Sequence, residues 1–163
     1  MNINQELFIR IAKHPVKFRM FLLFNLPSAF FSRIKIDAVN ENQSQVSVPF
    51  TWFTKNPFRS TYFACLAMAA ELSTGVLVMM NLYKRKPVCS MLVQNCSADF
   101  TKKATGFTDF TCLDGILISD TIEKAYLTNE PQVITVLSEG RNSNNEIIAS
   151  FYFTWSFKVK TDC

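Results

Sequence analysis

One acidic residue is a candidate for chemistry because of its surroundings. Glu71 is the only charged residue from Thr61 to Tyr83, a run that is otherwise mostly apolar. A carboxylate removed from water is costly unless another group satisfies it or a reaction uses it. Desolvation would also raise its pKa, which suits a general base near neutral pH. Glu71 is therefore the residue that any functional interpretation has to explain.

A polar segment precedes this apolar run and reads Asn56-Pro57-Phe58-Arg59-Ser60-Thr61-Tyr62-Phe63. Asn followed by Pro is typical of a helix start, since Asn caps free N–H groups and Pro suits the first helical position. We therefore expect one long helix from about Pro57 to Asn81, with Asn56 as its cap. The N–H groups around the helix start would be oriented donors for a developing oxyanion.

Other catalytic arrangements are disfavoured. The sole histidine, His14, lies in the N-terminal region, so a Ser-His-Asp triad with Ser60 or Ser73 is not expected. Cys65 has no base near it in sequence, and we expect it to pack in the core. The remaining cysteines are Cys89, Cys96, Cys112 and Cys163, without any Cys-x-x-Cys. This pattern favours reduced thiols in a cytoplasmic protein and no metal site.

Composition limits the function classes further. The chain has 163 residues, 48% of them hydrophobic and sixteen of them Phe, which fits a single domain with a sizeable core. A net charge of +4 permits anionic ligands but is too weak and dispersed for a nucleic-acid interface. The N-terminus has no signal-peptide pattern, because the apolar stretch from Met20 to Phe24 is short and no small-residue cleavage site follows it.

A membrane span is the main alternative for the apolar run. Thr61–Tyr83 is long enough to cross a bilayer, and the basic triplet Lys84-Arg85-Lys86 would be a positive flank. Against this, Glu71 lies near its middle and would be costly there. A helix that is apolar on all sides can instead be buried on all sides. We favour the buried helix and expect no membrane span.

The remaining chain predicts short helices and alternating strands. Residues 4–13 and 16–25 read as helices, with Pro27 as the end of the second. The capping box at Asp120-Thr121-Ile122-Glu123 predicts a short helix to about Leu127. The predicted strands cover residues 34–38, 46–50, 89–100, 105–112, 132–139 and 147–159. In the last of them Phe151, Phe153, Trp155 and Phe157 share one face.

This order predicts an α+β fold in which a curved, mostly antiparallel sheet of about six strands wraps the long apolar helix. The order of elements, the Asn56–Phe63 segment and the stretch Ala69-Ala70-Glu71-Leu72-Ser73-Thr74-Gly75 resemble the hotdog fold of the thioesterase superfamily. More narrowly, they are similar to a family of bacterial hotdog proteins related to the phenylacetyl-CoA-type acyl-CoA thioesterases. The resemblance covers about residues 34–158. It implies a single hotdog domain over residues 1–163, with an N-terminal helical extension over about residues 4–27.

The resemblance also implies an activity, the hydrolysis of an acyl thioester of coenzyme A or of acyl carrier protein. Asn56 matches an Asn that precedes the helix in those enzymes, and Glu71 matches their helical acid. Nine residues before that acid they carry His-Gly-Gly, where this chain has Tyr62-Phe63-Ala64. The glycine lets the thioester carbonyl approach a backbone N–H, and Phe63 would obstruct this approach. The alternative is therefore a non-catalytic hotdog protein that binds fatty acyl groups or acyl-CoA.

The expected site follows from these matches. The candidate catalytic residues are Glu71, Asn56 and Tyr62. The candidate substrate-binding residues are Ser60, Thr61 and Phe63 for the acyl thioester, and Lys84, Arg85, Lys102 and Lys103 for the coenzyme A phosphates. Met79, Met80 and Met91 are candidates for a flexible acyl tunnel. No metal and no cofactor is expected, apart from coenzyme A as part of the substrate.

Distance adds a requirement for a second chain. Tyr62 and Glu71 are nine residues apart, about 13 Å along one helix, and both would have to lie near one reacting group. Two antiparallel copies of the helix satisfy this, and the resembling hotdog enzymes use such a cross-subunit arrangement. We therefore expect a homodimer, or a dimer of such dimers, with its sites at the dimer interface.

Overall fold

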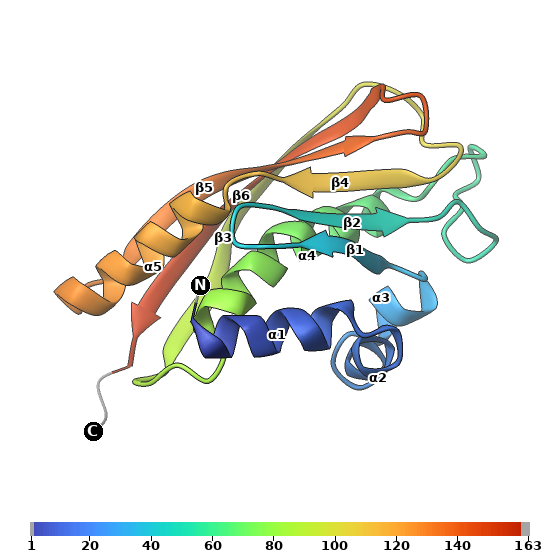
Figure 1. Cartoon of the computed structure of the whole chain (residues 1–163). Helices are drawn as coiled ribbons and strands as arrows, with labels where there is room; N and C mark the ends of the chain where they lie inside the picture. Colours follow the sequence, from blue (N-terminus) through green and yellow to red (C-terminus); the bar gives the residue numbers. More distant parts are fainter. Residues whose placement is uncertain (1, 161–163) are drawn as a thin grey trace.

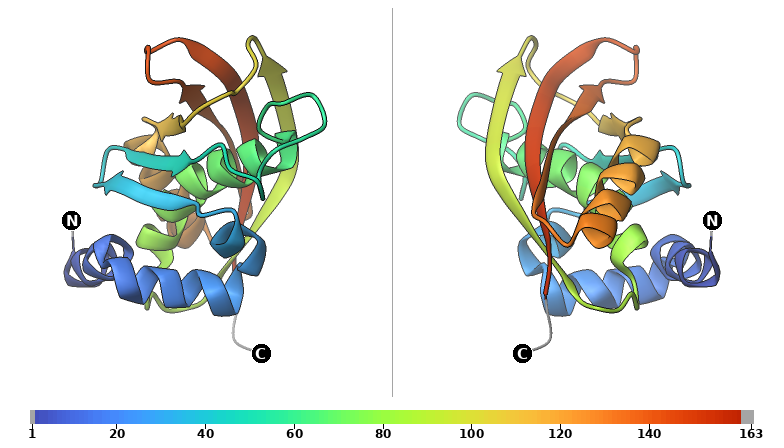
Figure 2. Two further views of the ribbon diagram at one scale, coloured as in Figure 1. Left: turned by 90° about the vertical axis from the view of Figure 1, so that its right-hand side faces the viewer. Right: turned by 90° about the vertical axis from the view of Figure 1, so that its left-hand side faces the viewer.

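The apolar run forms the centre of the molecule. In the computed structural model, which describes residues 2–160, helix α4 spans Phe63–Leu82 and a six-stranded sheet curves around it (Figures 1 and 2). Thirteen of the 20 residues of α4 are buried, which explains why the helix is apolar on all sides. The predicted α+β architecture, a curved antiparallel sheet around one long apolar helix, is therefore confirmed.

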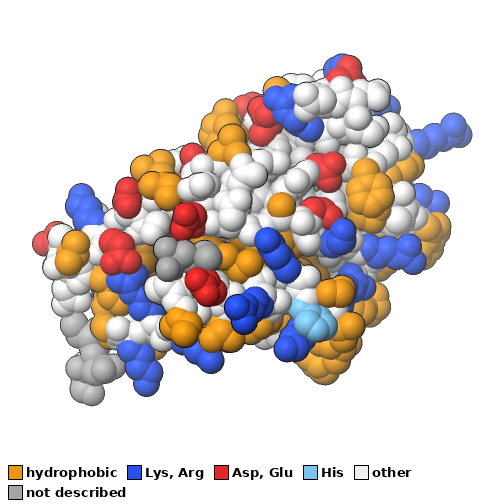
Figure 3. Space-filling model, in the orientation of Figure 1, with side chains coloured by type: hydrophobic (Ala, Val, Ile, Leu, Met, Phe, Trp, Pro, Cys, Tyr) orange, Lys and Arg blue, Asp and Glu red, His pale blue; other side chains and the backbone are white. Residues whose placement is uncertain are grey.

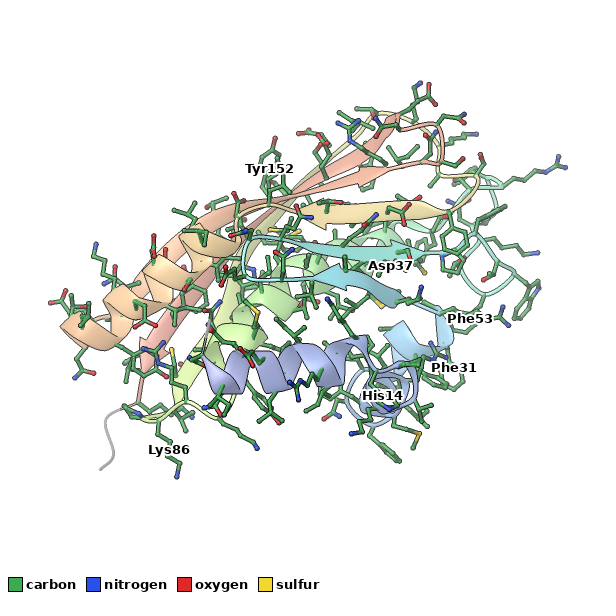
Figure 4. All side chains as sticks on the ribbon, viewed as in Figure 1. His14, Phe31, Asp37, Phe53, Lys86 and Tyr152 are labelled. Atoms are coloured by element: carbon green, nitrogen blue, oxygen red, sulfur yellow. The ribbon has the colours of Figure 1, made fainter. Side chains whose placement is uncertain are left out.

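The sheet is antiparallel throughout and follows the order β1-β2-β4-β5-β6-β3. Its strands are β1 Lys35–Val39, β2 Ser44–Val48, β3 Cys89–Phe100, β4 Thr108–Cys112, β5 Gln132–Arg141 and β6 Ile147–Val159. The alternation predicted for β6 is confirmed, since Phe151, Phe153, Trp155 and Phe157 are all buried. Tyr152 lies on the opposite face of the sheet, where its side chain points outward (Figure 4) and is 39% exposed. Because successive side chains of a strand point to opposite faces, one face of β6 is directed toward α4.

Three helices precede the sheet: α1 Ile3–Lys13, α2 Pro15–Asn25 and α3 Pro27–Phe31. The first two agree with the predicted helices. Pro27 does not simply end helical structure, because it begins α3, as expected for a residue that suits the first helical position. The outward side of α2 exposes Val16, Met20 and Phe24, and Figure 3 shows hydrophobic side chains gathered beside the one histidine.

The start of α4 corrects the predicted helix over Pro57–Asn81. The helix begins at Phe63 with Tyr62 as its N-cap, and no side chain caps it. The Asn56 side chain instead accepts hydrogen bonds from the N–H groups of Phe58 (2.9 Å) and Ser60 (3.2 Å). The capping capacity of Asn56 therefore shapes a loop before the helix rather than the helix itself.

Helix α5 spans Gly115–Thr128 and corrects the capping box predicted at Asp120. Thr121 lies inside the helix, and its hydroxyl donates to the carbonyl of Leu117 (2.8 Å). The helix starts earlier because its first residue packs on a distant turn: the Gly115 N–H donates to Asn42 O (2.9 Å), and a Cβ on Gly115 would lie 2.3 Å from Glu41 O. Only glycine allows this close approach.

Helix α4 is long and apolar enough to cross a membrane by length and composition. Its most apolar window is, however, 67% buried inside the fold. The sheet covers the apolar surface of the helix. Burial in the core therefore explains its apolar composition.

Candidate functional site

Three hollows hold nine of the ten predicted site residues, all except Arg85. The helix-start hollow, about 510 Å³, lies at the N-terminus of α4. The Glu71 hollow, about 390 Å³, lies between α4, the α2–α3 junction and the start of β3. The α1 hollow, about 400 Å³, lies between α1, α2 and the C-terminal end of α4. All three are in the size range of small-molecule sites.

The helix-start hollow brings together seven of the ten residues predicted for the site. They are Asn56, Ser60, Thr61, Tyr62, Phe63, Lys102 and Lys103. The first five are neighbours in sequence. The two lysines are far from them along the chain, and the contact depends on Thr61, whose N–H (2.7 Å) and hydroxyl (3.2 Å) both donate to the carbonyl of Ala104. This side of the hollow therefore carries positive charge next to the start of a helix.

The loop that leads to α4 is held rigidly. The side-chain N–H of Asn56 donates to the hydroxyl of Ser60 (3.1 Å), in addition to the two bonds that its carbonyl accepts. The N–H of Tyr62 donates to Thr54 O (2.7 Å). Phe53, in the same loop, lies beside Phe31 of α3 (Figure 4), with ring centroids 6.1 Å apart. The Asn56 side chain thus organises the loop that carries the candidate site.

Two backbone donors at the start of α4 are free. Within residues 2–160, no acceptor is hydrogen-bonded to the N–H groups of Phe63 and Ala64, whereas those of Cys65 and Leu66 donate to Tyr62 O. Free N–H groups in the first turn of a 20-residue helix point along its positive end. They can stabilise an oxyanion, although the rings of Tyr62 and Phe63, 47% and 57% exposed, stand beside them.

Glu71 lies at the mouth of the Glu71 hollow. Its side chain is exposed, yet the surrounding lining is mainly apolar and includes Met68, Leu72, Met79 and Trp155. Desolvation by these neighbours raises the pKa of Glu71 above its ordinary value, as the sequence predicted. Within the described residues no donor is hydrogen-bonded to its carboxylate. The group is therefore an acid with a raised pKa and no partner among the described residues.

Hydrogen bonds fix the part of α4 that carries Glu71. The indole N–H of Trp155 donates to the hydroxyl of Thr74 (3.0 Å), which itself donates to the backbone carbonyl of Glu71 (2.9 Å). One residue earlier, the hydroxyl of Ser73 lies 2.7 Å from that of Ser138 on β5. These buried contacts join α4 to the sheet. They place the carboxylate at a defined position.

The other two predicted cations lie elsewhere. Arg85 donates to both carboxylate oxygens of Glu123, and its guanidinium lies 3.7 Å from the ring centroid of Tyr126. Lys84 borders the α1 hollow, with its ammonium 5.4 Å from the ring centroid of Tyr83. The single chain therefore does not bring Lys84 and Arg85 together with the helix-start hollow.

The cysteines and the histidine do not form a nucleophilic site in the described part of the chain. Burial raises the pKa of the Cys65 thiol and raises that of Cys112 to about 12, so both stay protonated near neutral pH. His14 joins α1 to α2 (Figure 4), and its Nδ1 accepts from the N–H of Lys17 (3.4 Å). Over residues 2–160, no three His, Cys, Asp or Glu side chains cluster as a metal site requires. Cys163 lies outside the described residues.

Several residues near Glu71 were not predicted. Gly75 and Trp155 line its hollow, and so does Phe21 of α2. Gly75 follows Glu71 by four residues, so the helical period alone indicates that the two share a face. Of the three tunnel candidates, Met79 and Met91 line hollows, whereas Met80 is 1% exposed and packs in the core.

The sheet edge next to both hollows is open. Strand β3 pairs with β6 on one side, and its other side is the edge of the sheet. The Cys96 thiol on β3 has its pKa raised by desolvation and by the charge of Glu71, which places this strand within electrostatic reach of the carboxylate. Phe100 borders the helix-start hollow and Met91 borders the Glu71 hollow. The two hollows thus open toward opposite ends of the same strand.

Comparisons with known proteins agree with this architecture. The family described as "Domain of unknown function (DUF4442)" matches residues 17–156. No curated protein matches the sequence.

Solved structures share the fold at low sequence identity. A protein of unknown function from Pseudomonas aeruginosa, called a probable thioesterase, has a TM-score of 0.73 at 16% identity over 98% of this chain and 99% of its own. A thioesterase from Haemophilus influenzae has a TM-score of 0.64 at 10% identity, over 90% and 92%. The PaaI protein of E. coli, from the phenylacetic acid degradation operon, has a TM-score of 0.60 at 15% identity, over 94% and 96%. These likenesses establish the hotdog fold.

Proposed function

The chain belongs to the DUF4442 family, and we propose that it hydrolyses an acyl thioester of coenzyme A or acyl carrier protein at the interface of a homodimer. The thioesterase names of the P. aeruginosa and H. influenzae structures support the reaction class. The observation that carries the proposal is a pair of unsatisfied groups, the Glu71 carboxylate and the N–H groups of Phe63 and Ala64. These are the base and the oxyanion donors that ester hydrolysis needs.

The two groups need a second copy of the chain to meet. Phe63 and Glu71 are eight residues apart on α4, or about 12 Å, which is too far for one reacting carbonyl. Antiparallel pairing of β3 with its copy, about a two-fold axis between Asn95 and Cys96, sets Phe100 of one copy opposite Met91 of the other. The helix-start hollow of one protomer then adjoins the Glu71 hollow of its partner. Each dimer has two such composite sites.

In this site each group has one role. Glu71 takes a proton from the water that attacks the thioester carbonyl, or attacks that carbonyl itself to form an anhydride that water then hydrolyses; in both cases the C–S bond breaks and the carrier leaves as its thiol. Desolvation raises the pKa of Glu71, which strengthens it as a base. The N–H groups at the start of α4 hold the developing oxyanion. Lys103 attracts the phosphates of coenzyme A. Lys102, which also forms an ion pair with Glu146, attracts them as well. We assign the protein to the cytoplasm, a location supported by the free state of Cys65, Cys89, Cys96 and Cys112.

One observation favours the alternative of a non-catalytic acyl binder. The rings of Tyr62 and Phe63 meet edge to face, with centroids 5.1 Å apart, beside the free N–H groups. If the rings stay in place, a thioester carbonyl cannot approach these donors. Binding without hydrolysis is then the outcome.

Hydrolysis of an acyl-CoA panel by wild type and by Glu71→Gln separates the two functions. The proposal expects turnover by wild type and a kcat at least about 10²-fold lower in the variant, because the amide cannot take a proton. Equal turnover in both proteins would remove Glu71 from the mechanism. Tight binding of acyl-CoA without turnover in either protein would establish the binder instead.

A further inference from the structure

We infer that the Glu71 hollow and the α1 hollow form one passage for the acyl chain, and that the substrate is a long-chain fatty acyl group. This rests on the proposed function and adds a substrate class to it. The two hollows share three lining residues, Phe21, Met79 and Met91. A ligand that enters at Glu71 can therefore continue between these side chains into the α1 hollow.

Charge along the passage fits an apolar chain. Glu71 is the only charged residue among those that line the first hollow, and Lys84 is the only one in the second. These residues lie at opposite ends, one on the middle of α4 and the other just beyond its C-terminus. Between them the lining is almost entirely hydrocarbon, ring or thioether. A phosphate or a second carboxylate would be unpaired there, whereas an acyl chain loses only contact with water.

The length of α4 limits the length of the acyl chain that the passage can hold. From Glu71 to Met79 the helix rises about 12 Å, and from Glu71 to Tyr83 about 18 Å. An extended chain advances about 1.2 Å per bond, as the span of an extended backbone with three bonds per residue implies. Met79, which borders both hollows, is thus reached after about 10 bonds and the far end after about 15. The passage accommodates acyl groups of roughly 12–16 carbons.

Helix α1 encloses the far half of the passage. Phe8, Ile11 and Ala12 of this helix line the α1 hollow. The helix is tied to α4 by a hydrogen bond from Gln5 Nε2 to Asn81 Oδ1 (2.9 Å) and by the ring contact between Phe8 and Tyr83, 5.5 Å between centroids. It lies before residues 17–156, the part matched by the family. The chain-length preference is therefore a property that this N-terminal extension contributes.

Fatty-acid binding tests the passage without any hydrolysis. Trp155 lines the Glu71 hollow, and Trp52 is 79% exposed. In a Trp52→Phe protein, Trp155 is the only tryptophan and reports on the hollow by its fluorescence. Saturated fatty acids of increasing length should bind about fourfold tighter per added methylene, with a plateau at about 14–16 carbons. Affinity that stops rising at about eight carbons would overturn the passage.

Two variants that fill part of the passage, made in the Trp52→Phe protein, locate the bound acyl chain. Met79→Phe should weaken binding of a 16-carbon acid at least about tenfold and leave an eight-carbon acid unchanged, and Ile11→Phe should affect only the longest acids. Met20→Phe is the matched control, because Met20 is exposed on α2 and lines none of the three hollows. Equal effects of Met79→Phe and Met20→Phe would refute the passage. Chain-length-dependent binding in a protein that hydrolyses no thioester would refute the proposed function and leave the passage intact.

Discussion

The two edges of the sheet differ in length, charge and cover. Strand β1 has five residues, a bulge between Ile36 and Ala38, and an ion pair between Lys35 and Asp37 (2.6 Å). Helix α1 also packs against it. Strand β3 has twelve residues, none of them fully buried, and Asp99 is its only charged residue. Leu92 on this strand is 63% exposed.

The difference indicates which edge is better suited to the proposed pairing with a second copy. Natural proteins protect sheet edges with short strands, bulges and charges, and β1 has all three, whereas β3 is long and has a bulge between Val93 and Asn95 and one charged residue. Met91, Cys96 and Phe100 of β3 lie opposite Phe157, Phe153 and Ala149 of β6, which are buried, yet all three β3 residues are exposed. A long edge with a single charged residue and uncovered apolar side chains is suited to pairing with a second copy. Both hollows of the candidate site are bordered by residues of this edge strand, Met91 and Phe100.

The largest expected effect comes from removing one of the proposed oxyanion donors at the start of α4. Phe63→Pro deletes one free N–H group, and the backbone tolerates it because Phe63 is the first residue of α4 and Tyr62 is extended (φ −63°, ψ 134°). We expect kcat for acyl-CoA hydrolysis to fall by about 10²–10³-fold. Phe63→Ala keeps the N–H group and removes the ring, so it should retain kcat.

Mixing two inactive variants then tests whether the site spans two chains. A heterodimer of Phe63→Pro and Glu71→Gln has one intact composite site, so co-refolded equal amounts should recover about a quarter of wild-type activity. No recovery, with heterodimers demonstrated by mass spectrometry, would mean that both groups act within one chain.

A lysine placed on either edge should separate their roles. Asn95→Lys on β3 sets two cations near each other beside the two-fold axis of the proposed interface, and we expect the dimer dissociation constant to rise at least about 100-fold, with activity lost in parallel. Asp37→Lys on β1 is the control and should leave the oligomer intact. Sedimentation velocity measures both. A dimer that dissociates with Asp37→Lys instead would reverse the comparison of the edges.

A smaller effect is expected from the basic residues that flank the edge. Lys103→Glu in the helix-start hollow should raise KM for acyl-CoA about five- to tenfold at low salt and leave kcat nearly unchanged, because it acts on the phosphates and not on the carbonyl. Lys124→Glu, exposed on α5 and outside the three hollows, is the matched charge change. An equal rise of KM in both variants would indicate a general field effect without a phosphate site.

The smallest effect concerns stability and pH. Desolvation raises the folded pKa of Glu71, so between the unfolded and folded pKa values the native state binds more protons than the unfolded state. Stability from Glu71 is therefore present at low pH and lost as pH rises through its folded pKa. Glu71→Gln should gain Tm relative to wild type from pH 4 to pH 7.5, by about 1–2 °C for an accessible group.

Glu123→Gln supplies the opposite sign in the same melting experiment. The hydrogen bond from Arg85 lowers the pKa of Glu123, so its contribution is present at neutral pH and lost on acidification. This variant should lose Tm relative to wild type as pH rises. The same sign of change in both variants would contradict an apolar environment for Glu71.

The sequence by itself determined the features that depend on local period and composition. The alternation over Ile147–Val159 predicts β6, and the apolar run predicts a buried central helix, because burial of one face or of all faces leaves a direct pattern in the sequence. Glu71 was recognisable as the exceptional residue of that helix for the same reason. The five site residues from Asn56 to Phe63 gather in one hollow because they are close in sequence.

Only the tertiary structure decided where elements begin and which distant residues meet. Asn56 bonds its own loop, and Gly115 packs on the turn at Asn42, so both predicted helix starts were wrong. The contact of Thr61 with Ala104 brings Lys102 and Lys103 to the helix start, and the ion pair with Glu123 takes Arg85 away from it. Such choices depend on partners far apart in the chain, which local periodicity does not encode.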